Sequence, residues 1–207
     1  MVLRIIIFLL INFTGLFLGG LFTQEGVPSD WYQNLNKAPW TPPGWLFGFA
    51  WTTIMICFSI FLSVLWKKIA LIHFIYLYSI LFILNVIWNP LFFYFRWVFI
   101  ALIVIAFLTY MIGFTANKYK SEMRYYNLLL LPYFIWLIIA TSLNTYILIY
   151  NWNLIMNMFI NYVKKASRYR CKCNLEEWKI ISFYFFLFHL LSFVHNVKSI
   201  AILLHLP

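Results

Sequence analysis

The sequence predicts an all-α integral membrane protein built on a bundle of five transmembrane helices. Of its 207 residues, 65% are hydrophobic and only 10% are charged, whereas soluble domains average about 45–50% apolar and about 25% charged residues. The charges are also segregated. Apart from histidines, the uncharged runs cover residues 5–24, 38–66, 69–95, 97–117, 125–163 and 180–197. A helix needs about 20 apolar residues to cross a bilayer, and backbone groups in lipid must be bonded within their own segment.

Taken in order, the runs predict helices at about 3–23, 44–66, 70–94, 97–117 and 125–150. The connections after the second, third and fourth helices are short, which predicts that sequential helices pack side by side and antiparallel. Strand-like alternation is absent, which argues against a barrel. We expect residues 1–151 to form the membrane domain and 152–207 to form a C-terminal extension of unknown role. The apolar stretch Trp178–Asn196 in that extension is a candidate sixth membrane segment or re-entrant helix.

The net charge of +10 is better explained by basic residues flanking membrane helices than by nucleic-acid binding, because no basic helix or nucleic-acid motif is present. Six basic residues fall on one side of the bundle: Arg4, Lys67, Lys68, Lys118, Lys120 and Arg124. Lys37 and Arg96 fall on the other, but so would the five basic residues at 164–172, so the orientation stays open. Cys171 and Cys173, with His189 and His195, match no recognised zinc spacing, and no metal site is expected.

The first connection holds four tryptophans and three prolines in "DWYQNLNKAPWTPPGWLFGFAW", residues 30–51. The prolines fix backbone angles and predict a stiff loop at the mouth of the bundle. A stiff lid needs little further ordering when a ligand binds, and indoles offer broad flat faces. Trp31, Trp40, Trp45 and Trp51 therefore indicate a wall for a planar apolar ligand. The alternative is that they anchor helix ends at the membrane interface.

Amide side chains mark two of the predicted helices. Asn85 and Asn89 share one face with Trp88, and Pro132, Trp136, Ala140 and Asn144 recur every four residues. Polar residues in a membrane span usually face the bundle interior. Either they contact a ligand or they join helices to each other. Gly15 and Gly19 form a G-x-x-x-G pattern, which indicates helix packing or a dimer contact.

Four blocks occur in an order and spacing that resemble one family: "TGLFLGG" (14–20), the tryptophan-rich loop, "LNVIWNPLFF" (84–93) and "LPYFIWLIIATSLN" (131–144). Residues 1–151 are similar to the TspO/MBR family, the tryptophan-rich sensory proteins whose animal members are called translocator protein or peripheral benzodiazepine receptor. The resemblance implies a five-helix bundle with a pocket under the first loop. Its members bind porphyrins and haem precursors, sterols and synthetic isoquinoline or benzodiazepine ligands.

The residue patterns and the resemblance together give a set of candidate ligand-binding residues: Trp31, Trp40, Trp45, Trp51, Asn85, Trp88, Asn89, Tyr133, Trp136, Ala140 and Asn144. A light-dependent breakdown of protoporphyrin is attributed to some bacterial members, and for that reaction Trp31 and Trp136 would be the catalytic pair. No hydrolytic constellation is visible. The sequence departs from animal members in lacking a basic residue after Leu143 and Tyr146, where a cholesterol motif is proposed, and in its long tail.

The sequence thus predicts a membrane receptor for tetrapyrroles, with a role in porphyrin handling or stress regulation. It requires no cofactor and is expected to form a homodimer in a bacterial cell envelope, or in the mitochondrial outer membrane if the source is eukaryotic. Two alternatives stay open. One is a sterol or lipid carrier that uses the same cavity. The other is a regulatory membrane scaffold that acts through dimer contacts and whose pocket is incidental. Capture of a protein partner that survives the loss of ligand binding would support the scaffold.

Overall fold

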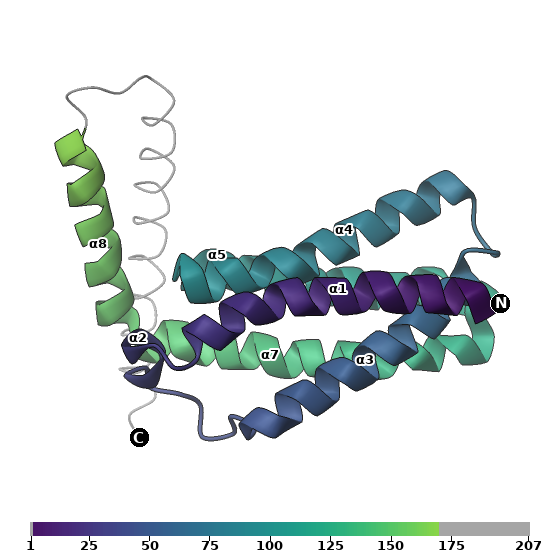
Figure 1. Cartoon of the computed structure of the whole chain (residues 1–207), viewed down its shortest axis with the longest axis horizontal. Helices are drawn as coiled ribbons and strands as arrows, with labels where there is room; N and C mark the ends of the chain where they lie inside the picture. The colour runs from purple at the N-terminus through teal and green to yellow at the C-terminus, as the bar shows by residue number, and fades with distance from the viewer. Residues whose placement is uncertain (1, 170–207) are drawn as a thin grey trace, which may run out of the picture. The chain divides into compact units, whose positions relative to one another are not determined.

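The computed structural model describes residues 2–169, which contain helices and no strands (Figure 1). The elements are α1 (Val2–Gly26), α2 (Asp30–Gln33), α3 (Gly44–Leu65), α4 (Leu71–Asn89), η1 (Pro90–Tyr94), α5 (Val98–Lys118), α6 (Lys120–Met123), η2 (Arg124–Leu130), α7 (Leu131–Tyr150) and α8 (Trp152–Tyr169). The chain divides into two compact units, Met1–Trp152 and Asn153–Pro207. The candidate sixth segment, the C-x-C pair, His189 and His195 all lie outside the described residues.

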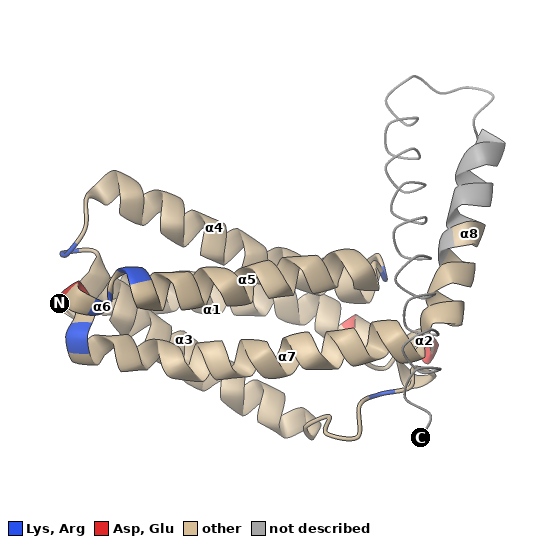
Figure 2. Cartoon of the chain, turned by 180° about the vertical axis from the view of Figure 1, so that it is seen from behind, with Lys and Arg blue, Asp and Glu red and all other residues tan. Residues whose placement is uncertain are grey.

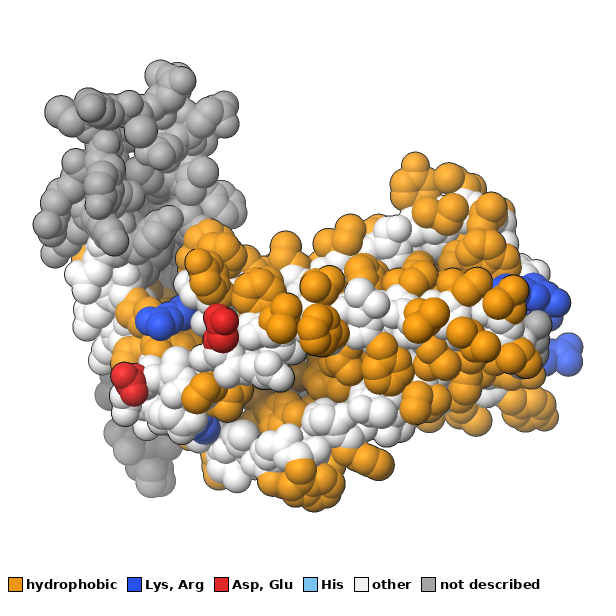
Figure 3. Space-filling view, in the orientation of Figure 1, with side chains coloured by type: hydrophobic (Ala, Val, Ile, Leu, Met, Phe, Trp, Pro, Cys, Tyr) orange, Lys and Arg blue, Asp and Glu red, His pale blue; other side chains and the backbone are white. Residues whose placement is uncertain are grey.

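Five segments are long and apolar enough to cross a membrane: Val2–Gly26, Gly44–Leu65, Leu71–Tyr94, Val98–Lys118 and Lys120–Tyr150. Within the first unit, lysine and arginine gather at the two ends of the bundle and leave its middle uncharged (Figure 2). Hydrophobic side chains cover much of the outer surface (Figure 3). The outside of the bundle is apolar because its solvent there is lipid rather than water. The protein is an integral multi-pass membrane protein, and the predicted fold class is confirmed.

The five long helices form a closed ring in the order α1, α4, α5, α7 and α3. Each of these helices packs against the next, and α3 closes the ring on both α7 and α1. The prediction that sequential helices are neighbours is therefore correct for α4–α5 and α5–α7 but wrong for α3–α4. Despite their short connection, α3 and α4 are separated by α1, because α1 presents a small-residue face that admits α4 closely.

That face consists of Gly15, Gly19 and Gly26 on α1. A Cβ atom at Gly15 would lie 2.7 Å from the Phe82 ring, and one at Gly19 would lie 2.5 Å from the Asn89 side-chain nitrogen. The glycine pattern therefore serves α1–α4 packing within one chain. Small residues permit such close approach of helix backbones in membranes.

Two of the predicted helices change geometry near an end. The predicted helix 70–94 is α-helical only to Asn89 and finishes as the π-helix η1, because Pro90 has no N–H to donate. The Phe95 N–H donates instead to the Pro90 carbonyl at 2.9 Å. The predicted helix 125–150 begins as the 3-10 helix η2 and becomes α-helical at Leu131, with Pro132 in its first turn.

A buried polar network ties three helices together near the middle of the bundle. The Asn12 amide donates to the Ser59 hydroxyl at 2.8 Å and accepts from the Tyr78 hydroxyl at 2.9 Å. Ser59 also donates to the Met55 carbonyl at 2.7 Å. Asn12 is 3% exposed. The network satisfies polar groups that would otherwise be costly in an apolar core, and it fixes α1 between α3 and α4.

Candidate functional site

The first loop covers one end of the bundle, and buried side chains hold it there. The short helix α2 is capped at its N-terminus by Ser29, whose hydroxyl accepts from the Tyr32 N–H at 3.3 Å. Trp31, Leu35 and Ala38 are all buried. Burial also raises the pKa of the Tyr32 phenol, so that ring stays neutral at physiological pH beneath the Lys37 ammonium, 4.6 Å from its centroid. The loop is therefore packed onto the bundle rather than free in solvent.

A side chain at the end of α7 also fastens this loop. Asn151 accepts from the Asn36 backbone N–H at 2.8 Å and donates to the Asn36 carbonyl at 3.1 Å. It donates in addition to the Ile147 carbonyl at 2.9 Å, within its own helix turn. No sequence motif indicated a role for Asn151. Its only signal in the sequence was an amide one residue beyond the last apolar turn.

The inner faces of α3 and α7 form an aromatic wall. The Trp51 and Tyr133 rings lie 6.1 Å apart, and the Phe47 and Trp136 rings lie 5.2 Å apart, both edge to face. Tyr133 and Trp136 are buried, and Ala140 lies one turn beyond Trp136. The N-terminal half of α3 diverges from α7 toward the loop (Figure 1). The space-filling view is hollowed between α1 and this part of α3, over an apolar floor (Figure 3).

A second aromatic cluster joins the loop to α4 and η1. Trp88 stacks on Phe92 at 5.3 Å, and Trp31 meets Phe92 edge to face at 5.7 Å. The Arg96 guanidinium lies 5.6 Å from the Trp31 ring centroid. The Trp31 indole N–H is enclosed and has no hydrogen-bond partner among residues 2–169. A buried donor without a partner is unfavourable, and it is a natural position for an acceptor supplied by a ligand.

The predicted amides differ in what they bond. In the amide orientation that satisfies its partners, Asn144 accepts from the Leu102 N–H at 3.2 Å and the Trp88 Nε1 at 3.3 Å. Asn89 accepts from the Thr23 hydroxyl at 3.1 Å and donates to the Asn85 carbonyl at 3.4 Å. Both amides therefore join helices. The Asn85 amide forms no side-chain hydrogen bond to any described residue, and it is only half-buried.

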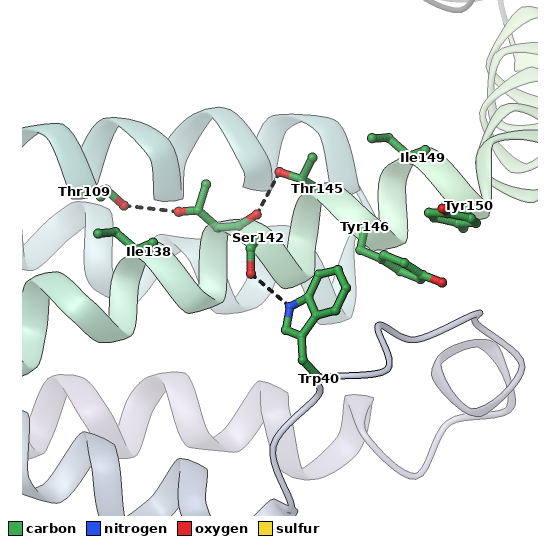
Figure 4. A pocket seen from close by; sticks show the side chains of 9 residues that line it. Trp40, Thr109, Ile138, Ser142, Thr145, Tyr146, Ile149 and Tyr150 are labelled. Carbon is green, nitrogen blue, oxygen red and sulfur yellow. Dashed lines mark hydrogen bonds between the residues drawn. The ribbon is translucent and has the colours of Figure 1, made fainter. Parts of the chain in front are cut away.

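Trp40 and Trp45 lie apart from these clusters. Trp45 is 71% exposed. Trp40 lies on the outward side of α7, where its indole N–H donates to the Ser142 hydroxyl at 3.2 Å and its ring meets Tyr146 at 5.4 Å (Figure 4). It lines a groove of about 470 Å³ with eight residues of α5 and α7: Thr109, Ile138, Thr141, Ser142, Thr145, Tyr146, Ile149 and Tyr150.

Comparison with known proteins gives one consistent family. Residues 7–150 match the sequence profile of the TspO/MBR family. The chain is 30% identical over 126 residues to the tryptophan-rich sensory protein of Cereibacter sphaeroides, covering 61% of this chain and 80% of that protein. It is 32% identical over 142 residues to the tryptophan-rich protein TspO of Archaeoglobus fulgidus, covering 65% and 88% respectively. It is 32% identical over 143 residues to the translocator protein of Bos taurus, covering 66% and 83%.

Proposed function

The chain belongs to the TspO/MBR family of membrane proteins, and on that premise we propose that its bundle binds a tetrapyrrole beneath the first loop. The observation that carries the proposal is the pair of aromatic clusters under the loop. One consists of the pairs Trp51–Tyr133 and Phe47–Trp136 between α3 and α7, and the other is Trp31–Phe92–Trp88, from the loop, η1 and α4. Flat aromatic faces favour a planar apolar ligand, and the loop separates such a ligand from water.

Charge at the same end of the bundle supports a ligand with acidic edges. Arg96 lies over Trp31, and Lys37 lies over Tyr32. Neither cation forms an ion pair with a described residue. A porphyrin such as protoporphyrin carries two carboxylates on an apolar macrocycle, whereas a sterol carries one neutral hydroxyl. Arginine and lysine at the rim would bind those carboxylates by charge-assisted hydrogen bonds. The unbonded Asn85 amide and the Trp31 N–H are the further polar groups available to such a ligand.

Titration of the purified protein in detergent with protoporphyrin tests the proposal, with quenching of tryptophan fluorescence as the signal. We expect saturable quenching that an excess of cholesterol does not reverse. Arg96→Gln and Lys37→Gln should each weaken protoporphyrin binding, and they should have less effect on a porphyrin ester whose carboxylates are blocked. Absence of saturable quenching in folded protein would refute tetrapyrrole binding.

Light-dependent breakdown of bound protoporphyrin is a separate proposal from protoporphyrin binding. It would need Trp31 and Trp136 to exchange electrons with the excited pigment in the presence of oxygen. Illumination of the protoporphyrin complex in air, followed by loss of pigment absorbance, tests it. Loss faster than that of free protoporphyrin in detergent, removed by Trp31→Phe with Trp136→Phe, would make the protein an enzyme. Equal loss would make it a binding protein only.

The outward groove supports a second candidate, a lipid or sterol site. The groove is lined by aliphatic and aromatic side chains and by the hydroxyl-bearing residues Thr109, Thr141, Ser142 and Thr145, and the surface that they present is mainly apolar. An apolar molecule with one hydroxyl would match that lining. Ser142→Ala removes the Trp40 bond and should alter sterol binding there without changing protoporphyrin binding. If one substitution changed both, a single shared site would be indicated.

A further inference from the structure

The helix α8, which follows the bundle, differs in kind from the five long helices. It has 18 residues and is strongly amphipathic, whereas the five membrane-spanning helices are apolar on every side. Asn153, Asn157 and Asn161 recur every four residues and are exposed, so they form one polar face. Trp152, Ile155 and Met156 have the spacing of the opposite face and are half-buried.

The charge of α8 has one sign. Its sequence contains Lys164, Lys165 and Arg168 and no aspartate or glutamate. Positions 164 and 168 follow 157 and 161 by seven residues, which is the spacing of a single helix face. Arg170 and Lys172 come next in the sequence. A helix with an apolar face, a basic polar face and low overall hydrophobicity is typical of segments that lie in a membrane surface. The helix α8 is also not among the described segments that are apolar enough to span a membrane.

The position of α8 in the sequence suits a helix that lies in a membrane surface. Only Asn151 separates it from α7, a membrane-spanning helix, so Trp152 begins α8 where α7 ends. Tryptophan is enriched at that boundary between hydrocarbon and headgroups. Asn151 is buried, and its bonds to Asn36 fasten the end of α7 to the first loop.

We propose that α8 lies in the membrane surface and binds anionic lipid headgroups, with its apolar face in the acyl boundary and its basic residues on the phosphates. The partner is a lipid surface rather than a protein because the helix is joined directly to a membrane span and carries only positive charge. This inference is independent of the tetrapyrrole proposal, since it concerns residues outside the ligand-binding bundle.

Fluorescent labels on two adjacent residues of the full chain test the inference. In a background with Cys57→Ser, Cys171→Ser and Cys173→Ser, an environment-sensitive dye is attached at Met156→Cys or at Asn157→Cys. Each protein is placed in nanodiscs of phosphatidylcholine alone or of phosphatidylcholine with phosphatidylglycerol. We expect the dye at 156 to be quenched by lipid-attached nitroxide in the anionic discs, and the dye at 157 to be quenched by aqueous iodide.

The triple variant Lys164→Gln, Lys165→Gln, Arg168→Gln should lose the extra lipid quenching seen in anionic discs. The docking equilibrium is expected to fall by roughly fivefold for each basic residue removed near an anionic surface. Arg4→Gln, Lys67→Gln, Lys68→Gln changes the net charge equally at other sites and should leave docking unchanged. Circular dichroism checks the fold of each variant.

Three results would each overturn the inference. One is equal lipid quenching in neutral and anionic discs. Another is a triple variant that docks as well as the parent. The third is a dye at 156 that is shielded from both quenchers, since that would mean a protein partner or a second copy covers the helix.

Discussion

The side-chain amide of Asn151 pairs with both backbone polar groups of Asn36, 115 positions earlier in the chain. It connects the first loop to the last turn of α7. Asn151 is 5% exposed, so water cannot readily replace these bonds. The pair sets how the loop lies over the two aromatic clusters.

Asn151→Ala should therefore release the loop. The Asn36 N–H and carbonyl lose their partners, and leaving such groups unsatisfied costs about 1–3 kcal/mol. We expect faster amide hydrogen exchange across residues 29–41 and faster dissociation of bound protoporphyrin. Hydrogen exchange with mass spectrometry measures the first effect, and stopped-flow fluorescence measures the second.

The matched control is Asn36→Ala. This change keeps the backbone groups that Asn151 binds and removes only a long 3.5 Å contact from the Asn36 amide to the Tyr150 carbonyl. We expect its exchange pattern to resemble that of the parent. Equal loosening in both variants would show that the paired backbone bonds do not hold the loop.

The membrane helices were predictable because they depend only on the length and composition of runs along the sequence. A charge-free run of about 20 residues must be helical in lipid whatever it packs against. The order of helices in the ring was not predictable in the same way. It depends on which faces fit, and the fit of Gly15 and Gly19 against α4 and of Gly26 against η1 is a property of three-dimensional shape. Loop length alone predicted the wrong neighbour for α3.

The arrangement of the candidate site residues was predictable where they share a helix face, and it was not predictable where they meet across the sequence. The recurrence of Trp136, Ala140 and Asn144 follows from helical period alone. The partners of Asn12 and Asn151 lie in other elements, so no local pattern indicated them. The position of Trp40 was equally hidden, because the path of a proline-rich loop over α7 is set by contacts such as its bond to Ser142.

Two adjacent glycines on α1 give opposite predictions. An alanine at Gly19 would place its methyl group against the Asn89 amide, whereas Gly20 has open space around it. We expect Gly19→Ala to destabilise the protein by about 1–3 kcal/mol, the usual cost of overpacking. Gly20→Ala should cause no loss, because alanine favours helix over glycine. Thermal unfolding in detergent compares the two variants. Similar melting temperatures would refute close packing of Gly19 against Asn89.

The Thr23–Asn89 bond should stabilise the α1–α4 contact rather than bind ligand. Thr23→Val keeps the side-chain shape and deletes the hydroxyl that donates to Asn89. Interhelical hydrogen bonds in membranes contribute about 0.6 kcal/mol on average and up to about 1.7. A double-mutant cycle with Asn89→Ala should give a coupling free energy in that range. Loss of protoporphyrin affinity with unchanged stability would instead assign Asn89 to the ligand.

Substitutions at Trp136 and Trp45 distinguish a tryptophan that forms a pocket wall from one that anchors a helix in the membrane interface. Trp136 is 7% exposed and packs on Phe47, while Trp45 is 71% exposed. If a tetrapyrrole lies against the α3–α7 wall, Trp136→Ala removes one stacking face. Loss of a comparable base–aromatic stack costs about 1–3 kcal/mol, so the protoporphyrin dissociation constant should rise by roughly fivefold to a hundredfold or more.

The control follows from the exposure of Trp45, which can contact lipid headgroups but not the inner face of α7. Trp45→Ala should leave the dissociation constant within about twofold of the parent, because its indole contributes no stacking face to the interior. Both variants must first give the parent's helical circular dichroism, since Trp136 is also a core residue. A folded Trp136→Ala protein with unchanged affinity would place the ligand elsewhere, and a large effect of Trp45→Ala would move the site to the outer rim of α3.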